Sequence, residues 1–306
     1  MADRARAKDR ADPAPGAESD GADADIGGSR AGILYIVATP IGNLGDVTLR
    51  ALEVLRAVPL IAAEDTRMAA RLLGRYEIPT RTVSFHARSG PARVRELLDH
   101  LRGGADLAVV TDAGTPGVSD PGEELVTAWV DAGGRVVPIP GASAVLAAVA
   151  ASGVAGPRWG FEGFLPRAGR ERRERIVRIA ADDRSTILFE APTRLSATLR
   201  DLATACGTDR PAAICRELTK LHEQIVRGTL GGLLEGVASG EIPARGEAVL
   251  VVAPGPGPAG ASATDLAAAL GMVDALVRAG TSRGDAAKAV AAATGLVRRR
   301  LYRPDQ

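Results

Sequence analysis

The chain has 306 residues, of which 46% are hydrophobic and 25% are charged, and its 38 Lys and Arg nearly balance its 37 Asp and Glu. These fractions are typical of a soluble globular protein and exclude a collagen-like, wholly disordered or coiled-coil chain. Because a domain usually has roughly 100–200 residues, the length predicts two domains rather than one. The formal net charge of +1 excludes a histone-like coat for nucleic acid, so any basic surface must be local.

The scarcity of cysteine and histidine excludes other classes. Two cysteines, Cys206 and Cys215, cannot form a disulfide framework, which fits a reducing cytoplasm. The three histidines are widely spaced and form no cluster with cysteine, so we expect no metal site. No apolar run reaches the ~18 residues that a membrane span requires. We therefore expect a cytoplasmic protein that binds neither metal nor membrane.

Residues 1–31 contain almost no large apolar side chain and predict a disordered tail. A nucleic-acid-binding arm is the alternative, but acids outnumber bases in this segment. From Ile33 the pattern changes to short apolar runs, each ending in a turn and followed by a helical period. These runs predict strands at 33–38, 60–63, 107–111 and 136–139.

Two acids are expected to begin helices in this first half. Asp46 should cap a helix through Leu49, Leu52 and Leu55, and Asp120 with Pro121 should form the cap and first turn of another. Strands that alternate with helices predict a mostly parallel α/β sheet. The first domain would then span residues 32–152.

A Gly-, Pro- and aromatic-rich stretch at 153–166 predicts a domain junction. A second α/β set follows, with strands at 186–191, 212–218 and 247–253, a helix from Thr193 and another near 230–238. These elements predict a second domain at 153–254. The composition of 255–263 predicts a linker, and 264–306 reads as a module of two or three short helices that carries an arginine run.

Three glycine-rich turns follow strands of the first half: TPIGNLGD, DAGTPGVSD and PGAS. One such turn alone is usually an ordinary strand-to-helix connection. Three of them at the carboxyl edge of a parallel sheet indicate a small-molecule cleft, because glycine lets the backbone approach a ligand closely.

The three turns do not by themselves identify the class of ligand. No GxxxxGK[ST] motif is present, which excludes a P-loop. The spacing of a dinucleotide fingerprint is also absent, although Glu64 lies about where a ribose-binding acid would, so a nicotinamide cofactor stays possible. Glu64, Asp65 and Asp112 lie near strand ends beside Arg67, and they could orient a substrate, act as a base or form a structural ion pair.

Basic segments suggest a ligand with many phosphates. One run covers residues 167–175, a second lies at 298–303, and Arg216 and Lys220 flank an acid at a strand end. Each could equally be a solvated surface. Two runs beside the predicted cleft favour phosphate contacts modestly.

The same segments resemble the tetrapyrrole methylase superfamily of S-adenosylmethionine-dependent methyltransferases. The similarity is strongest to its ribosomal RNA small-subunit methyltransferases, which modify the 2′-hydroxyl of a cytidine. The strings TPIGNLGD, EDTR and DAGTP carry it together with FEGFLPR, LFEAPTRL and CRELTKLHE, and all fall in the family's order within about residues 33–253. After EDTR this chain has Met68 where the family commonly has histidine, and the segment after His86 lacks the family's further His and Asn.

The resemblance implies a two-domain class III methylase of the α/β class with a small helical C-terminal module. It implies S-adenosylmethionine as cofactor, a homodimer, and a cytidine ribose of 16S ribosomal RNA, within an assembled or partly assembled small subunit, as substrate. Carried onto this chain, it places the cofactor at Thr39, Pro40, Gly42, Asp112, Ala113, Gly114, Thr115, Ser119, Asp120, Gly141, Ala142, Phe164 and Leu165.

Methyl transfer to a ribose hydroxyl also needs residues that act on the oxygen. Glu64, Asp65 and Asp112 are the candidates for a base or orienting acid, and Lys220 or Arg216 could stabilise the developing alkoxide. The basic side chains expected to contact RNA are Arg67, Arg167, Arg170, Arg216, Arg298, Arg299 and Arg300.

Two other functions stay open. A methyltransferase of tetrapyrrole precursors could use the same scaffold, but the basic C-terminal module would then lack a role. A non-catalytic RNA-binding protein would leave the glycine-rich turns without a ligand.

Overall fold

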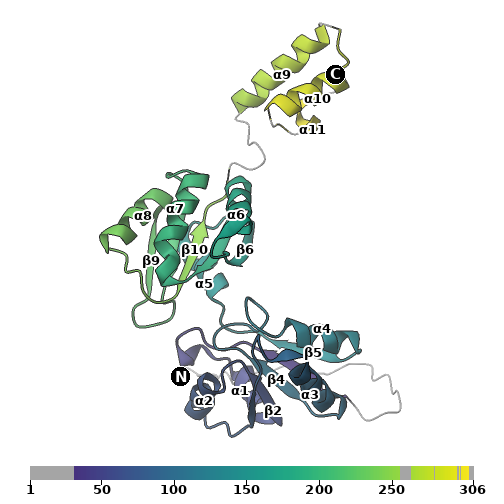
Figure 1. Ribbon diagram of the computed structural model, residues 1–306, viewed down its shortest axis with the longest axis vertical. Coiled ribbons are helices and arrows are strands. Elements are labelled where there is room, and N and C mark those ends of the chain that lie inside the picture. Colours follow the sequence, from purple (N-terminus) through teal and green to yellow (C-terminus); the bar gives the residue numbers. More distant parts are fainter. Residues whose placement is uncertain (1–30, 256–262, 279, 295, 297, 303–306) are drawn as a thin grey trace, which may run out of the picture. The chain divides into compact units, whose positions relative to one another are not determined.

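The computed structural model describes residues 31–302 except 256–262, 279, 295 and 297 (Figure 1). The predicted tail at 1–31 and linker at 255–263 lie outside these residues, apart from their terminal positions Ala31, Gly255 and Ala263.

The first sheet has five parallel strands in the order β3-β2-β4-β1-β5. They are β1 (Ile33–Val37), β2 (Leu60–Ala63), β3 (Thr82–Ser84), β4 (Leu107–Val110) and β5 (Arg135–Ile139). The central strands β2 and β4 are buried at every position, as strands covered on both faces must be.

Helices cover both faces of this sheet. α1 (Leu49–Ala57) and α2 (Thr66–Arg75) pack on one face, and α3 (Gly90–Arg102) and α4 (Glu123–Asp131) on the other. The short 3-10 helix η1 (Leu44–Asp46) lies in the turn after β1. All loops that follow the strands therefore begin at one edge of the sheet.

The second sheet is mixed, whereas the alternation of strands with helices predicts a mostly parallel sheet. Its order is β6-β7-β10-β8-β9, and only β6 and β7 pair in parallel. The strands are β6 (Trp159–Phe164), β7 (Ser185–Glu190), β8 (Pro211–Arg216), β9 (Gln224–Thr229) and β10 (Ala248–Val252). A short loop joins β8 to β9, and a connection this short permits only antiparallel pairing.

The second sheet is also covered on both faces. α6 (Gly169–Ala181), α7 (Leu195–Cys206), which follows η2 (Pro192–Arg194), and α8 (Leu230–Ser239) pack on one face. α5 (Ala144–Ser152) packs on the other through Val145 and Ala148.

Both predicted helix caps in the first half are wrong. The cap of α1 is Thr48, whose hydroxyl accepts from the Ala51 amide, while Asp46 lies inside η1. α4 begins at Glu123 after Gly122, and Asp120 belongs to the preceding loop. The left-handed backbone of Ser119 (φ 65°) and Gly122 (φ 137°) keeps this loop from joining the helix earlier.

The C-terminal residues form three helices with their own core. α9 (Ala263–Arg278), α10 (Arg283–Thr294) and α11 (Arg298–Leu301) bury a cluster that includes Val273, Val290 and Leu301.

Candidate active site

Backbone hydrogen bonds tie together the two glycine-rich turns that follow β1 and β4. The Thr39 amide donates to Gly114 O at 2.8 Å, and the Gly114 amide donates back to Thr39 O at 3.1 Å. The Thr39 hydroxyl also donates to Thr111 O at 3.0 Å. Because β1 and β4 are adjacent, this bridge fixes both turns at the edge where an open α/β sheet binds its ligands.

A cavity of about 450 Å³ lies against the second of these turns. This volume falls within the ~300–1,000 Å³ typical of small-molecule sites. The turn after β4 forms one wall, and the start of α5 and residues of the second sheet form the others. Seven predicted cofactor-binding residues line it: Asp112, Ala113, Gly114, Thr115, Ser119, Asp120 and Phe164.

A smaller cavity of about 200 Å³ shares Asp112 and Ala113 with the first. Thr39, Pro40 and Gly42 line it, and so does Lys220. A Cβ at Gly42 would collide with the stem of the Lys220 side chain, so only glycine lets these segments approach.

The remaining predicted cofactor residues do not line either cavity. Leu165 is buried in the core under α6 and α7, which contradicts a ligand contact through its side chain. Gly141 and Ala142 immediately precede the lining residues Ser143–Val145. A Cβ at Gly141 would lie 3.0 Å from Ala38 Cβ, so this glycine is needed to pack the turn against the end of β1.

Five acidic residues line the larger cavity: Glu64, Asp112, Asp120, Glu190 and Glu247. Glu190 pairs with Arg194 and Glu247 with Lys220, whereas the first three form no ion pair with a cation among the described residues. The Asp112 amide donates to Glu64 Oε2 at 3.3 Å, and the Asp65 amide donates to Asp112 Oδ1 at 3.1 Å. Burial raises the pKa of both Glu64 and Asp112. Burial, followed by the charge of Glu64, raises the pKa of Asp120 to about 6.

Asp65 has a different role from the one expected. Its carboxylate caps α2 by accepting from the Arg67 amide, and it pairs with the Arg67 guanidinium at 2.6 Å. These bonds lower the pKa of Asp65 to about 2, and the side chain does not line the cavity. A helix cap with so low a pKa is a poor base, which contradicts the expected catalytic role of Asp65.

Lys220 lies at the edge of the smaller cavity between two acids. Its Nζ donates to Glu217 Oε1 at 2.9 Å and to Glu247 Oε2 at 2.8 Å. Burial lowers its pKa, but the two carboxylates more than offset this, so the net shift is upward. Glu217 and Thr219, which precede it, have left-handed backbones at φ 48° and 66°. Strained backbone of this kind is concentrated at functional sites. The two ion pairs hold the Lys220 ammonium at the cavity edge.

Arg216 does not meet the expectation of an RNA contact. Its side chain is buried, donating from Nη1 to Gln224 Oε1 at 2.8 Å and from Nη2 to Arg245 O at 2.6 Å. It stabilises the end of β8 instead.

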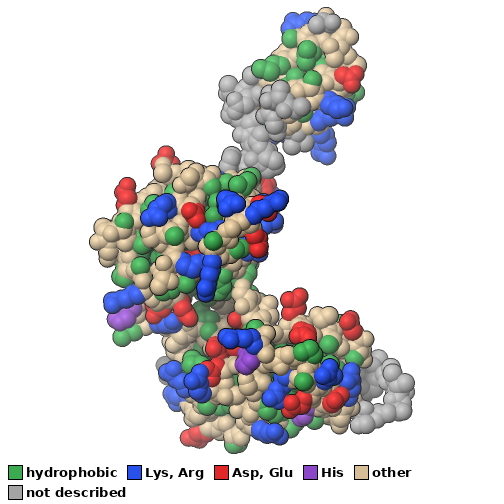
Figure 2. All heavy atoms as spheres, in the orientation of Figure 1, with side chains coloured by type: hydrophobic (Ala, Val, Ile, Leu, Met, Phe, Trp, Pro, Cys, Tyr) green, Lys and Arg blue, Asp and Glu red, His purple; other side chains and the backbone are tan. Residues whose placement is uncertain are grey.

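The other arginines predicted to contact RNA are exposed. Arg67 pairs with Asp65, Arg170 pairs with Glu174, and one guanidinium nitrogen of Arg298 donates to Gly284 O at 3.2 Å. The face drawn in Figure 2 shows Lys and Arg in separate groups among acids rather than in one continuous patch.

Several cavity residues escaped prediction from the sequence. They come from the ends of β7 and β10 and from the loop after β8: Phe189, Glu190, Ala191, Pro192, Leu218, Glu247 and Val249. The segment LFEAP at residues 188–192 could have indicated some of them, because a strand that ends before Ala-Pro has its last residues at the edge of the sheet.

The raised pKa of Asp120 should make the thermal stability of the folded protein depend on pH. Below its unfolded pKa, near 3.9, Asp120 is neutral in both states; as pH rises through about 6, the folded protein must bear a half-buried charge and loses stability. Asp120→Asn should therefore raise the melting temperature by about 2 °C at pH 8, allowing for solvent screening, and by much less at pH 4. Thermal unfolding of both proteins at the two pH values tests this, and an equal shift at both would contradict it.

Among the described residues, no helix is long and apolar enough to cross a bilayer. The same part of the chain holds no group of three or more His, Cys, Asp or Glu side chains arranged to bind a metal ion.

Comparison with known proteins defines the class first. The family model described as tetrapyrrole (corrin/porphyrin) methylases matches residues 33–234. A solved structure of cobalt precorrin-4 methyltransferase has a TM-score of 0.57 at 20% identity and covers 72% of this chain and 94% of its own. Uroporphyrin-III C-methyltransferase from Thermus thermophilus, solved with S-adenosylhomocysteine, has a TM-score of 0.53 at 20% identity and covers 72% and 97%. The fold is that of the class III methylases.

Relatives of higher identity define the family. A protein of Synechocystis named ribosomal RNA small subunit methyltransferase I is 46% identical over 89% of this chain and 96% of its own. The protein of that name from Micromonospora olivasterospora is 44% identical over 91% and 87%, and that from Xylella fastidiosa is 42% identical over 90% and 99%. This chain belongs to the ribosomal RNA small subunit methyltransferase I family of tetrapyrrole methylases.

Proposed function

We propose that the protein transfers a methyl group from S-adenosylmethionine to the 2′-hydroxyl of a cytidine in 16S ribosomal RNA. The cavity carries the cofactor part of this proposal, and the names of the relatives carry the RNA part. A homodimer in the cytoplasm, acting on an assembled or partly assembled small subunit, belongs to the same proposal.

The residues of the cavity fit this cofactor. Its sulfonium and ammonium groups are cationic, and the acidic residues Glu64, Asp112 and Asp120 are among those that line the cavity. Phe164 and Phe189 supply flat apolar surface for a base. The turn at Gly114 brings backbone groups to the wall without a side chain between them and the ligand.

When bound, the cofactor supplies a methyl group on a positively charged sulfur, which leaves with the electron pair of the C–S bond as the O–C bond forms. The chain must therefore hold the ribose oxygen in line with this bond and exclude water. A carboxylate of the cavity accepts the proton of the 2′-hydroxyl, and Asp120, with a pKa of about 6, is best matched to this role near neutral pH. Lys220, fixed by Glu217 and Glu247, stays charged and can stabilise the developing alkoxide.

The basic surfaces belong to the RNA part of the proposal. We assign phosphate contacts to Arg67, Arg167, Arg170 and the arginines of α11, and we leave out the buried Arg216. The target ribose is reached in single-stranded or locally opened RNA, where the base can be splayed out of its stack.

The proposal is tested by methylating small-subunit RNA in vitro, digesting it with nuclease and mapping the added mass. A methyl group on a cytidine ribose supports the proposal. Methylation of a tetrapyrrole precursor with none of RNA, or RNA binding with no affinity for S-adenosylmethionine, would overturn it in favour of one of the two alternatives.

The Gly114 turn offers a matched pair of variants. Gly114 and Gly117 have left-handed φ angles of 82° and 83°, and neither would bring a Cβ within 3.4 Å of another group. Alanine strains both equally, but only Gly114 lines the cavity. We expect Gly114→Ala to weaken S-adenosylmethionine binding by about tenfold and Gly117→Ala by less than about twofold. Calorimetry measures both, and equal losses would remove the turn's backbone from the proposed site.

A further inference from the structure

Three phenylalanine rings form a wall in the second half of the chain. The centroids of Phe161 and Phe189 are 4.8 Å apart with an edge-on arrangement, and those of Phe164 and Phe189 are 5.6 Å apart. Phe164 and Phe189 line the larger cavity, where Phe164 is 51% exposed. An aromatic face left open inside a cavity is suited to stacking on another planar ring.

The direction of the Phe164 ring depends on an irregular segment of backbone. The pairing of β6 with β7 shifts register between Phe161 and Phe164. Gly163, in that interval, has a left-handed φ of 61°. Phe164 is paired with Phe189 only beyond this shift, so the position of its ring also depends on what holds the irregular segment.

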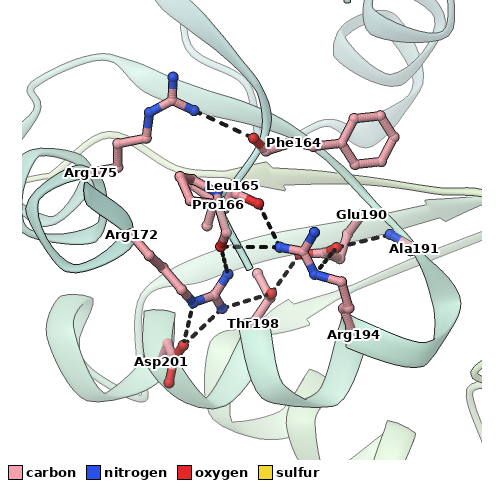
Figure 3. A network of polar contacts seen from close by, with 10 residues as sticks. All are labelled: Phe164, Leu165, Pro166, Arg172, Arg175, Glu190, Ala191, Arg194, Thr198 and Asp201. Carbon is pink, nitrogen blue, oxygen red and sulfur yellow. Dashed lines mark hydrogen bonds and ion pairs between the residues drawn. The ribbon is translucent and has the colours of Figure 1, made fainter. Parts of the chain in front are cut away.

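Three arginines hold this segment by donating to the carbonyls of residues 162–166 (Figure 3). Arg175 Nη1 reaches Glu162 O at 3.3 Å and Phe164 O at 3.4 Å. Arg194 Nη2 reaches Leu165 O at 2.5 Å and Pro166 O at 3.3 Å. Arg172 Nη1 also donates to Pro166 O, at 3.0 Å. Backbone carbonyls on both sides of Phe164, and its own, are thus held by side chains.

Arg194 is itself fixed by a buried acid. Its Nε lies 3.2 Å from Glu190 Oε1, and the Glu190 side chain is 0% exposed. Glu190 also accepts from the Thr198 hydroxyl at 2.5 Å and from the Ala191 amide at 2.9 Å. Thr198 accepts in turn from Arg172 at 3.0 Å. Figure 3 shows Arg194 between the carboxylate of Glu190 and the carbonyls of Leu165 and Pro166.

This double contact requires the planar fork of arginine. A guanidinium can donate in two directions from fixed positions, whereas a lysine ammonium on the same backbone is a single point. Arg194→Lys keeps the positive charge beside the buried Glu190 but cannot also hold both carbonyls.

We propose that Phe164 stacks on a nucleobase in the cavity and that Arg194 is the positioning residue that fixes Phe164 for this contact. The inference rests on the proposed function, which supplies two nucleobases: the adenine of the cofactor and the target base of the RNA. Both are planar and stack alike, so the experiment must tell them apart.

The test is a double-mutant cycle with Phe164→Leu and Arg194→Lys. Affinity for S-adenosylhomocysteine is measured by calorimetry, and KM and kcat for small-subunit RNA at saturating cofactor. Phe164→Leu should weaken one of the two by about tenfold. Arg194→Lys should weaken the same quantity, and the double variant should be no weaker than the Phe164→Leu protein, because both changes remove one interaction.

Arg184→Lys is the control for the chemical change itself, since Arg184 pairs with Asp182 at 2.8 Å in a more exposed ion pair outside this network. Measurements are made at a temperature where every variant is folded by circular dichroism, and Phe164→Leu alters a half-exposed side chain and should fold in any case. The control should leave both constants within about twofold of the wild type.

The results separate the sources and the failures. A loss confined to S-adenosylhomocysteine assigns the ring to the cofactor, and a loss confined to the KM for RNA assigns it to the target base; each supports the proposal. Unchanged constants in both single variants overturn it, and losses that multiply in the double variant overturn the positioning role of Arg194. A wild type that neither binds S-adenosylhomocysteine nor methylates RNA refutes the proposed function instead, and this inference then loses its basis.

Discussion

Replacing Asp120 with asparagine should lower the rate of RNA methylation at saturating cofactor by roughly 10²- to 10⁴-fold at pH 7.5, and it should weaken S-adenosylmethionine binding by far less. The reason is the position of Asp120 beside Glu64 in the cavity and its pKa of about 6. Asparagine keeps the size of the side chain but cannot accept the proton of the 2′-hydroxyl. Single-turnover methylation with excess enzyme, together with calorimetry, measures the two effects separately.

The pH dependence of the same reaction provides a second measurement. Asp120 must be ionised to act as a base, so the wild-type rate should rise tenfold per pH unit below about pH 6 and level off above it. Asp120→Asn should lose this inflection. A rate that falls equally at every pH would show that Asp120 positions the ligand without accepting a proton.

Asp65→Asn is the control for this prediction. Asp65 is an acid next to Glu64 in sequence, but its carboxylate caps α2 and pairs with Arg67. Its loss should cost some stability through the cap and leave the rate within a few-fold of the wild type. If Asp120→Asn keeps full activity and either Glu64→Gln or Asp112→Asn does not, the base is one of those two carboxylates.

The parts of this site that carry a local signal could be predicted from the sequence. The turns after β1 and β4 could be predicted because glycine and a strand ending leave local signals, and the carboxyl ends of parallel strands share an edge. Nine of the residues that the family resemblance placed at the cofactor lie in these two turns and line one of the two cavities, and a tenth, Phe164, lies at the end of β6.

The errors arise where distant residues decide the outcome. Arg216 and Lys220 lie in one basic segment, yet Arg216 points into a buried network with Gln224 and Arg245 while Lys220 reaches the cavity edge. The sequence does not show which of these two side chains is buried, because that depends on the residues that each one contacts in other parts of the fold. In the second sheet the predicted strand β10 lies antiparallel between β7 and β8, and a pattern of apolar runs does not give strand direction. The pattern also misses β9, because Arg227 and Gly228 interrupt its apolar run.

Asp65 and Asp120 show the same limit for electrostatics. Both are acids in loops that follow strands of the first sheet, yet the pKa of one is about 2 and that of the other about 6. The first is set by a guanidinium two residues away, and the second by burial and by Glu64 from another strand end. The spacing of residues in the sequence does not reveal burial or the approach of a charge from another strand.

Removing the C-terminal helices by truncation after Gly260 should raise the KM for RNA at least tenfold at about 0.1 M salt and leave S-adenosylmethionine affinity unchanged. The helices bury an apolar cluster of their own, including Val273 and Leu301, so their loss uncovers no part of the cavity lining. Arg299 and Arg300 of α11 are exposed and carry the predicted phosphate contacts.

A finer variant tests the charges alone. Arg299→Gln with Arg300→Gln should reduce the salt dependence of RNA binding by about two units of slope, one for each lost contact, and weaken binding to every sequence alike. Arg102→Gln is the control, because Arg102 is an exposed arginine of α3 that pairs with Asp99 at 3.0 Å. Contacts to phosphate release counterions whatever the base sequence is, so a reduced slope of RNA affinity against salt concentration would identify contact with the RNA backbone. An unchanged slope in both the double variant and the truncated protein would show that these helices do not bind RNA.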